Sequence, residues 1–154
     1  MKEIALEEYF TDCLALKKKI LFIMPHHRFD CIVCLKRSGW ILGSYLSNQL
    51  VLPVFTCSEI KSIPVDKFKN VLIVDDKIST GKSMNNAINK CKNMGLSYRT
   101  ACIYVQEEVT TDFWIHKTNN QRIQPFYEVR NERYNNNYPK DNKVGKLSPG
   151  IKSC

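Results

Sequence analysis

The chain has 154 residues, a length typical of one domain with one hydrophobic core. Its 23 Lys and Arg against 15 Asp and Glu give a formal charge of +8, and 44% of its residues are apolar, too many for general disorder. The purely apolar runs are too short to cross a bilayer, and residues 1–8 are acidic where a secretory signal would be basic. We therefore expect a cytoplasmic protein with no membrane contact.

The chain has seven cysteines, an odd number, and most lie within apolar segments. A free cysteine in such a segment packs as a small hydrophobic residue, and a reducing compartment keeps it reduced. Cys31 and Cys34 have the CxxC spacing of some zinc sites, but no second chelating pair with finger-like spacing accompanies them. We therefore predict structural thiols rather than disulfides or zinc ligands.

Apolar residues at helical spacing predict a helix over Ile4–Lys19, with Glu7 and Glu8 in its first half and three lysines at its end, as the helix dipole favours. The following elements are predicted in order: strand Asp30–Leu35, helix Trp40–Leu50, strand Val51–Phe55, strand Lys69–Val74, helix Lys82–Met94, strand Thr100–Val105 and a weaker strand within Arg122–Tyr127. Pro53 indicates that its residue lies at the start of a strand or in an edge strand of the sheet. Gly95 is expected to end the helix Lys82–Met94.

This alternation predicts an α/β domain, residues 1–130, with an open and mostly parallel sheet flanked by helices. Ligands bind such sheets beyond the carboxyl ends of the strands, which draws attention to two expected loops, residues 36–39 and 75–83. Residues 131–154 are basic and rich in Asn and Lys, and they predict a mobile or loosely docked tail. Weak nucleic-acid binding and simple solubilisation are both consistent with that tail.

The expected loop 75–83 combines features that bind phosphate. Asp75 and Asp76 follow a buried strand, hydroxyl side chains follow at Ser79 and Thr80, and a helix begins just after Gly81. A helix amino terminus beside a glycine and hydroxyls binds phosphate. Two carboxylates exposed at the strand end would accept hydrogen bonds from sugar hydroxyls or hold a divalent cation. We therefore predict a site for a phosphorylated sugar.

Two alternative interpretations of this loop are weaker. Gly81, Lys82 and Ser83 match the end of a Walker A motif, but Asp76 occupies the position of its first glycine and would repel a nucleotide phosphate. Helix capping explains one acidic residue, but not two acids followed by hydroxyls and a glycine.

The segment Val71–Ser83 resembles the signature of the type I phosphoribosyltransferases, in which four apolar residues and two acids precede a phosphate cradle. Residues 29–39 are similar to the family's first core strand and diphosphate loop. Residues 99–105 and 111–114 are similar to the base-side strand and loop of bacterial xanthine-guanine and hypoxanthine phosphoribosyltransferases, and residues 124–128 to the chain ending of that subgroup. The similarity covers roughly residues 29–128 and implies the family's fold.

The resemblance also implies a role for each matching residue. Asp75 and Asp76 would be the catalytic acids, holding the ribose hydroxyls of 5-phosphoribosyl diphosphate directly or through Mg²⁺. The 5′-phosphate would be bound by Ser79, Thr80, Gly81, Lys82 and Ser83. The diphosphate would be bound by Lys36, Arg37, Ser38 and Gly39. The acceptor base would be contacted by Ile78, Phe113 and Trp114.

The reaction implied is transfer of the phosphoribosyl group to a ring nitrogen of a purine-like base, with release of diphosphate, by a Mg²⁺-dependent enzyme that is commonly a homodimer. The chain departs from the family pattern at Ser79, where many purine-using members carry an acid, and in the short segment Thr56–Asn70, where many have a flap. It also lacks the usual base-side lysine, for which Lys77 or Lys117 could substitute. The alternative function is a non-catalytic sensor of 5-phosphoribosyl diphosphate or a nucleotide, with its basic tail on nucleic acid.

Overall fold

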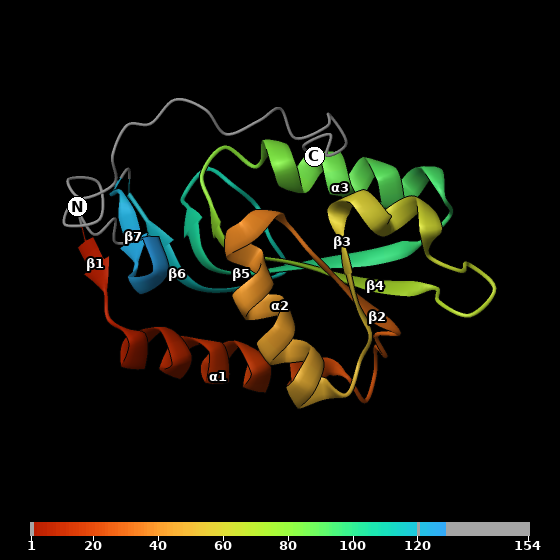
Figure 1. Ribbon diagram of the computed structural model, residues 1–154, viewed down its shortest axis with the longest axis horizontal. Helices are drawn as coiled ribbons and strands as arrows, with labels where there is room; N and C mark the ends of the chain where they lie inside the picture. The colour runs from red at the N-terminus through yellow and green to blue at the C-terminus, as the bar shows by residue number, and fades with distance from the viewer. Residues whose placement is uncertain (1, 120, 129–154) are drawn as a thin grey trace, which may run out of the picture.

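Parallel strands form the central sheet of the computed structural model, which describes residues 2–119 and 121–128 (Figure 1). The strands of this sheet are β2 (Cys31–Cys34), β3 (Val54–Thr56), β4 (Asn70–Ile78), β5 (Ser97–Gln106) and β6 (Phe113–Thr118). Their spatial order is β3-β2-β4-β5-β6, and all four pairings are parallel. A separate parallel pair joins β1 (Lys2–Ile4) to β7 (Ile123–Pro125). The predicted tail, residues 131–154, lies outside the described residues.

Helices cover both faces of the central sheet, as predicted. The helices α1 (Leu6–Ile23) and α2 (Lys36–Leu50) pack on one face, and α3 (Lys82–Asn93) packs on the other with the 3₁₀ helix η1 (Cys57–Ser62) (Figure 1). A short 3₁₀ helix, η2 (Phe126–Glu128), follows β7. None of the helices among the described residues is long and apolar enough to cross a membrane.

The central strand β4 explains why the sheet is buried on both sides. Its residues 71–74 are all apolar and all fully buried. Leu72 and Val74 face α1 and α2, whereas Val71 and Ile73 face α3 and η1. A strand that is apolar on both faces is typical of a parallel sheet covered by helices.

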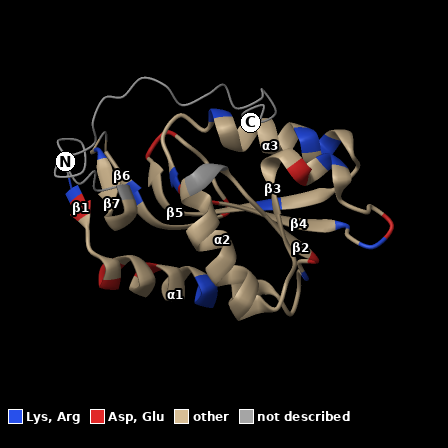
Figure 2. Cartoon of the chain, in the orientation of Figure 1, with Lys and Arg blue, Asp and Glu red and all other residues tan. Residues whose placement is uncertain are grey.

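Several predicted boundaries were wrong. Ile4 belongs to β1, where it pairs with Pro125, so α1 begins only at Leu6, and it continues to Ile23. The acidic side chains do lie in its first turn (Figure 2), but its last turn has no basic residue, so the three lysines do not end the helix. The predicted base-side loop at 111–114 instead enters β6, whose first residue, Phe113, pairs with Ala101 of β5.

Other predictions were confirmed. The helix α3 begins at Lys82 as expected, and Gly95, with φ of 69°, follows its end. Pro53 immediately precedes β3, which is an edge strand of the sheet. The segment between β3 and β4 is ordered by η1, where Glu59 accepts a hydrogen bond of 2.7 Å from the N–H of Thr56.

A close approach of α2 to β2 fixes the position of that helix. A Cβ atom added at Gly43 would lie 2.7 Å from the Cβ of Cys34, a distance that real structures essentially never show. Ala would otherwise favour the helix by about 1 kcal/mol over Gly. Gly43 is therefore present because α2 and β2 must touch.

We predict that Gly43→Ala lowers the free energy of unfolding by about 1–3 kcal/mol, because the added methyl overpacks this contact. Ser44→Ala is the matched control, since Ser44 is exposed on the same helix and should change stability by about 0.5 kcal/mol or less. Urea unfolding measures both variants. A Gly43→Ala protein as stable as the control would show that the contact is not tight.

The buried thiols predict a loss of stability in alkali. All six described cysteines are buried thiols, and burial is the main cause that raises the pKa of Cys31 to about 12 and of Cys91 to about 11, from an ordinary 9.0. The unfolded thiols ionise first, so the stabilisation is complete below about pH 9 and is lost as pH rises towards 11–12. The free energy of unfolding, measured in reductant, should therefore fall as pH rises across this range. Cys91→Ala should make this fall less steep, by about 1.4 kcal/mol per pH unit or less. An unchanged slope would contradict this assignment.

Candidate functional site

The carboxyl end of β4 leads through a tight turn into α3. The strand ends at Ile78, residues 79–81 form the turn, and α3 begins at Lys82. Gly81 has φ of 74°, a left-handed conformation that residues with a Cβ rarely adopt. Ser79 and Thr80 are exposed, so their hydroxyls lie at the surface beside the α3 amino terminus. The predicted residues 79–83 are thus brought together as a helix-terminal turn suited to phosphate.

A second helix amino terminus lies beside the same strand. The N–H of Leu35, which precedes α2, donates to the carbonyl of Val74 at 3.0 Å. A Cβ atom added at Gly39, in the first turn of α2, would lie 3.2 Å from Oδ1 of Asp75. The predicted loop 36–39 was therefore wrong, because these residues are helical, but a helix start still offers backbone N–H donors. The side chains of Lys36 and Arg37 lie outside the described part of the structure.

Asp75 and Asp76 are not exposed, contrary to the prediction. Both lie within β4, with 7% and 0% of their surface accessible. Asp75 lies beside the first turn of α2, and its Oδ1 accepts a hydrogen bond of 3.0 Å from the N–H of Asp76. The strand extends further than predicted because Asp75, Lys77 and Ile78 continue its pairing with β5.

The two carboxylates point to opposite faces of the sheet, as consecutive strand residues do. Burial and then neighbouring charges, among them Asp76, raise the pKa of Tyr9 on α1. Burial and then the charge of Asp75 raise the pKa of Cys102, whose side chain packs on the α3 face. A single metal ion can therefore contact only one of the two acids directly. Within residues 2–119 and 121–128, no group of three His, Cys, Asp or Glu side chains could hold a metal ion.

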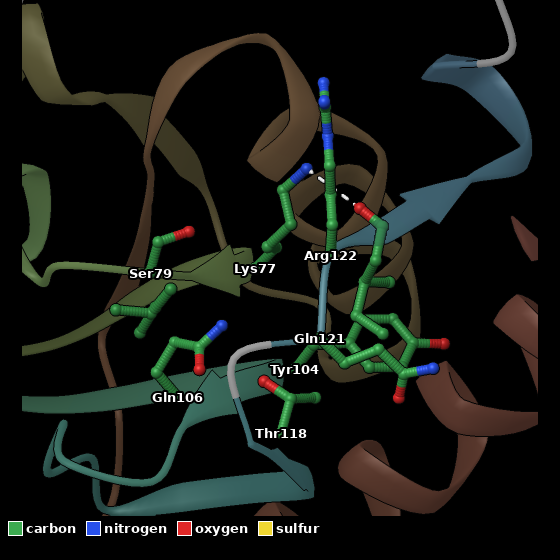
Figure 3. Close-up of a pocket in the computed structure, with 9 residues that line it drawn as sticks. Lys77, Ser79, Tyr104, Gln106, Thr118, Gln121 and Arg122 are labelled. Carbon is green, nitrogen blue, oxygen red and sulfur yellow. Dashed lines mark hydrogen bonds between the residues drawn. The ribbon is translucent and has the colours of Figure 1, made fainter. Parts of the chain in front are cut away.

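A pocket of about 150 Å³ opens beside this turn (Figure 3). From the ends of β4, β5 and β6 it is lined by Lys77, Ile78, Ser79, Tyr104, Gln106 and Thr118. From the segment that leads into β7 it is lined by Gln121, Arg122 and Ile123. Because Ser79 belongs to both the pocket and the turn, a ligand spanning the two would have its phosphate at α3 and its other end in the pocket.

A partly buried network holds one wall of this pocket. The hydroxyl of Tyr104 donates to Oδ2 of Asp12 at 2.8 Å, and Nε2 of His116 lies 2.9 Å from Oδ1 of the same carboxylate. The rings of Tyr104 and His116 stack with centroids 5.3 Å apart. Burial and the bond to Asp12 raise the pKa of Tyr104 well above its ordinary value. Asp12 thus joins α1 to β5 and β6 behind the pocket.

The structure places two predicted base-binding residues elsewhere. Phe113 is 8% exposed and packs in the core, and the ring of Trp114 lies under the ammonium groups of Lys19 and Lys117. Neither aromatic lines the pocket, whereas Ile78 does. Of the two lysines considered for the base side, Lys77 lines the pocket, and its Nζ donates to the carbonyl of Ile123 at 3.4 Å.

Sequence reasoning missed Tyr104, Gln106, Thr118 and Arg122. The rule that ligands bind at the carboxyl ends of parallel strands could have identified the ends of β5 and β6. The sequence pattern points to residues 36–39 and 75–83 only, because it does not predict β6 as a strand.

We predict that Asp12→Ala lowers the free energy of unfolding by about 2–4 kcal/mol, because it leaves the Tyr104 hydroxyl buried without its acceptor. Glu8→Ala on the same helix is the matched control. It removes only an exposed ion pair with Lys2, of 2.8 Å, worth about 1 kcal/mol or less. Unfolding in denaturant measures the free energy of unfolding of both variants. Equal losses of stability in the two would show that the network around Asp12 contributes little.

Comparison with known proteins supports the architecture. No protein-family model and no curated protein sequence matches the chain. Among solved structures, it is similar to the xanthine-guanine-hypoxanthine phosphoribosyltransferase of Helicobacter pylori, with 21% identity and a TM-score of 0.73, over 87% of this chain and 97% of that one.

Two further solved structures are similar over most of their length. The purine phosphoribosyltransferase of Pyrococcus horikoshii has 20% identity and a TM-score of 0.67, over 82% of this chain and 93% of that one. A hypothetical protein of Neisseria gonorrhoeae with bound ppGpp has 14% identity and a TM-score of 0.69, over 88% of this chain and 94% of that one. The chain therefore has the fold of the type I phosphoribosyltransferases.

Proposed function

We propose that the protein transfers the phosphoribosyl group of 5-phosphoribosyl diphosphate to a ring nitrogen of a purine-like heterocycle and releases diphosphate. One observation carries the proposal: the amino termini of α2 and α3 both lie at the end of β4, and a pocket opens at Ser79 between that end and β7. Phosphate groups bind at helix amino termini, and this ligand has a phosphate at one end of its sugar and a diphosphate at the other.

The roles follow from position. The 5′-phosphate would lie on residues 79–83, where backbone N–H groups and exposed hydroxyls face outward. The diphosphate would lie at the first turn of α2, residues 36–39. Asp75 is the acid nearest to that turn and would meet the ribose hydroxyls. Asp76 is fully buried towards α1 and would support the strand end rather than touch the ligand.

The acceptor would occupy the pocket in place of the site first predicted around Phe113 and Trp114. Ile78 offers an apolar contact for a flat ring, and the side chains of Lys77, Gln106 and Arg122 offer polar groups to its substituents (Figure 3). A volume of about 150 Å³ is below the roughly 300 Å³ at which sites for drug-sized ligands begin, so a small heterocycle suits it.

Mg²⁺ fits this arrangement through one acid. Mg²⁺ in nucleotide-type sites is bound by one or two carboxylates together with substrate phosphates and water, and Asp75 beside α2 is the carboxylate placed for that. When bound, the ion would stabilise charge on the departing diphosphate.

The protein's own contribution is orientation and electrostatic stabilisation. Holding the anomeric carbon next to the pocket converts an encounter in solution into a step within one complex. Backbone N–H groups at the start of α2 would stabilise the negative charge that develops on the leaving diphosphate. We also propose that the protein works in the reducing cytoplasm, which accords with its buried thiols.

We predict that the full chain binds 5-phosphoribosyl diphosphate in the presence of Mg²⁺ and that Asp75→Asn weakens this binding about 10–100-fold, the effect of losing a hydrogen bond to a charged group. Isothermal titration calorimetry measures the affinity. Asp66→Asn is the matched control, because Asp66 is exposed between η1 and β4, and it should bind as the unmodified protein does. Melting temperatures of both variants check that each remains folded.

Three outcomes distinguish the assignments. No binding by the unmodified protein overturns the proposed function. Binding that is equally strong in both variants overturns the role of Asp75. Binding without diphosphate release across a panel of purine and pyrimidine bases contradicts the transferase and leaves the binding site intact.

A further inference from the structure

The turn between β4 and α3 is supported by a segment that is distant in sequence, residues 107–112 between β5 and β6. Gly81 has no Cβ, and Cγ1 of Val109 lies 3.4 Å from the position that a Cβ would take, an ordinary van der Waals distance. The other neighbour of that position is Nδ2 of Asn85, 3.9 Å away in α3 itself. Val109 therefore packs on the turn from a different part of the fold.

The turn needs such support because its own interactions are few. Gly81 has φ of 74°, and a glycine leaves this conformation as easily as it enters it. Among the described residues, no side-chain hydrogen bond caps the start of α3 at Gly81. The hydrogen bond from the N–H of Lys82 to Oγ1 of Thr80 is long, at 3.4 Å. The backbone at Gly81 sets the direction of the N–H groups that begin α3, so anything that fixes Gly81 also fixes these donors.

The segment that carries Val109 is itself held at both ends. The N–H of Val109 donates to the carbonyl of Gln106 at 3.0 Å, which closes a turn directly after β5. At the other end, Oδ2 of Asp112 accepts hydrogen bonds from the N–H and the hydroxyl of Thr100, of 2.7 and 2.9 Å. The side chain of Val109 is half-buried and packs against the apolar cluster on the α3 face of the sheet. Val109 is thus a fixed support for Gly81.

We propose, on the basis of the function proposed above, that Val109 is a positioning residue for the 5′-phosphate. Its γ-methyl groups hold Gly81 in the left-handed conformation, and the N–H groups at the start of α3 then point at the phosphate before the ligand arrives. Val109 acts through Gly81 and contributes no polar group to the ligand. A turn that must be ordered on binding loses affinity, because the entropy cost of fixing its backbone is subtracted from the binding free energy.

A purely structural role for Val109 makes a different prediction. A side chain that only fills space under α3 would change the free energy of unfolding, but the folded protein would bind phosphate with unchanged affinity. Positioning instead changes the affinity of the folded protein for any ligand that carries the 5′-phosphate. Ribose 5-phosphate is therefore a sharp probe, since it keeps this phosphate and lacks the diphosphate assigned to α2.

The test measures binding to the full chain by isothermal titration calorimetry, with ribose 5-phosphate and, separately, with 5-phosphoribosyl diphosphate and Mg²⁺. Val109→Ala should weaken both by the same factor, about three- to tenfold, the cost of ordering roughly one residue of backbone. Val109→Ile keeps both γ carbons and should bind as the unmodified protein does. Val65→Ala is the matched control, because it makes the same change at an exposed position between η1 and β4.

Hydrogen exchange gives a second readout that needs no ligand. In Val109→Ala, the N–H groups of residues 80–83 should exchange about threefold faster or more, because local opening of the turn costs less free energy. The buried strand residues 71–74 report the stability of the whole domain, and their exchange should be unchanged. Equal acceleration in both regions would indicate general destabilisation and would overturn the positioning role.

The failure of this inference is distinct from the failure of the proposed function. Unchanged affinity of Val109→Ala for both ligands, or unchanged exchange at residues 80–83, overturns the role of Val109 and leaves the transferase standing. A loss confined to 5-phosphoribosyl diphosphate also overturns it, because the effect would then lie away from the 5′-phosphate. Absence of binding of either ligand to the unmodified protein overturns both.

Discussion

The helix α2 contacts the central sheet through glycines at two positions one turn apart, Gly39 and Gly43, which lie on the same side of the helix. At Gly43 the contact is with Cys34 of β2, and at Gly39 it is with Asp75 and the carbonyl of Val74 in β4. A side chain at either position would push the helix outward. The first turn of α2 would then leave the end of β4, and the donors proposed for the diphosphate would no longer face the ribose site.

This contact also sets an electrostatic constraint on the site. Asp75 is almost fully buried, and burying a carboxylate is unfavourable unless hydrogen bonds or a positive potential compensate. The N–H of Asp76 and the amino terminus of α2 provide both. A diphosphate approaching the same helix end would meet that carboxylate, and a divalent cation between the two would remove the repulsion. The position of one acid is thus a physical reason for the Mg²⁺ in the proposed function.

The sequence was informative where the site is contiguous. Residues 71–83 pass from a buried strand through a glycine turn into a helix, and each step has a local signal in residue type. It was misleading where local preference and tertiary structure disagree. Aspartate is rare in strands, so the residue pattern predicts a strand that ends at Val74, although pairing with β5 extends β4 to Ile78. The basic segment before Trp40 gave no helix signal, yet it forms the first turn of α2.

The rest of the site could not be predicted because its residues are distant in sequence. Asp12, Tyr104 and His116 meet only when α1 packs on β5 and β6, and no spacing rule connects them. The pocket likewise needs β6 to pair with β5, and the segment before β7 to lie near the ends of β4 and β5. Such contacts depend on the order of strands in the sheet, which a single sequence specifies only through the whole fold.

The pairing of β1 with β7 makes the beginning of the chain part of the frame of the pocket. The N–H of Lys2 donates to the carbonyl of Arg122 at 3.0 Å, and Lys2 pairs with Ile123 in the ladder, so both pocket residues are anchored by a strand from the other end of the sequence. Contacts between such distant segments form late, because the intervening loop must close first. During synthesis on the ribosome, the helix-terminal turn at residues 79–83 emerges well before β7, and the pocket wall formed by residues 121–123 is in place only after β7 has paired with β1. Extra residues fused ahead of Lys2 would thus lie next to the strand pair that anchors this wall of the pocket.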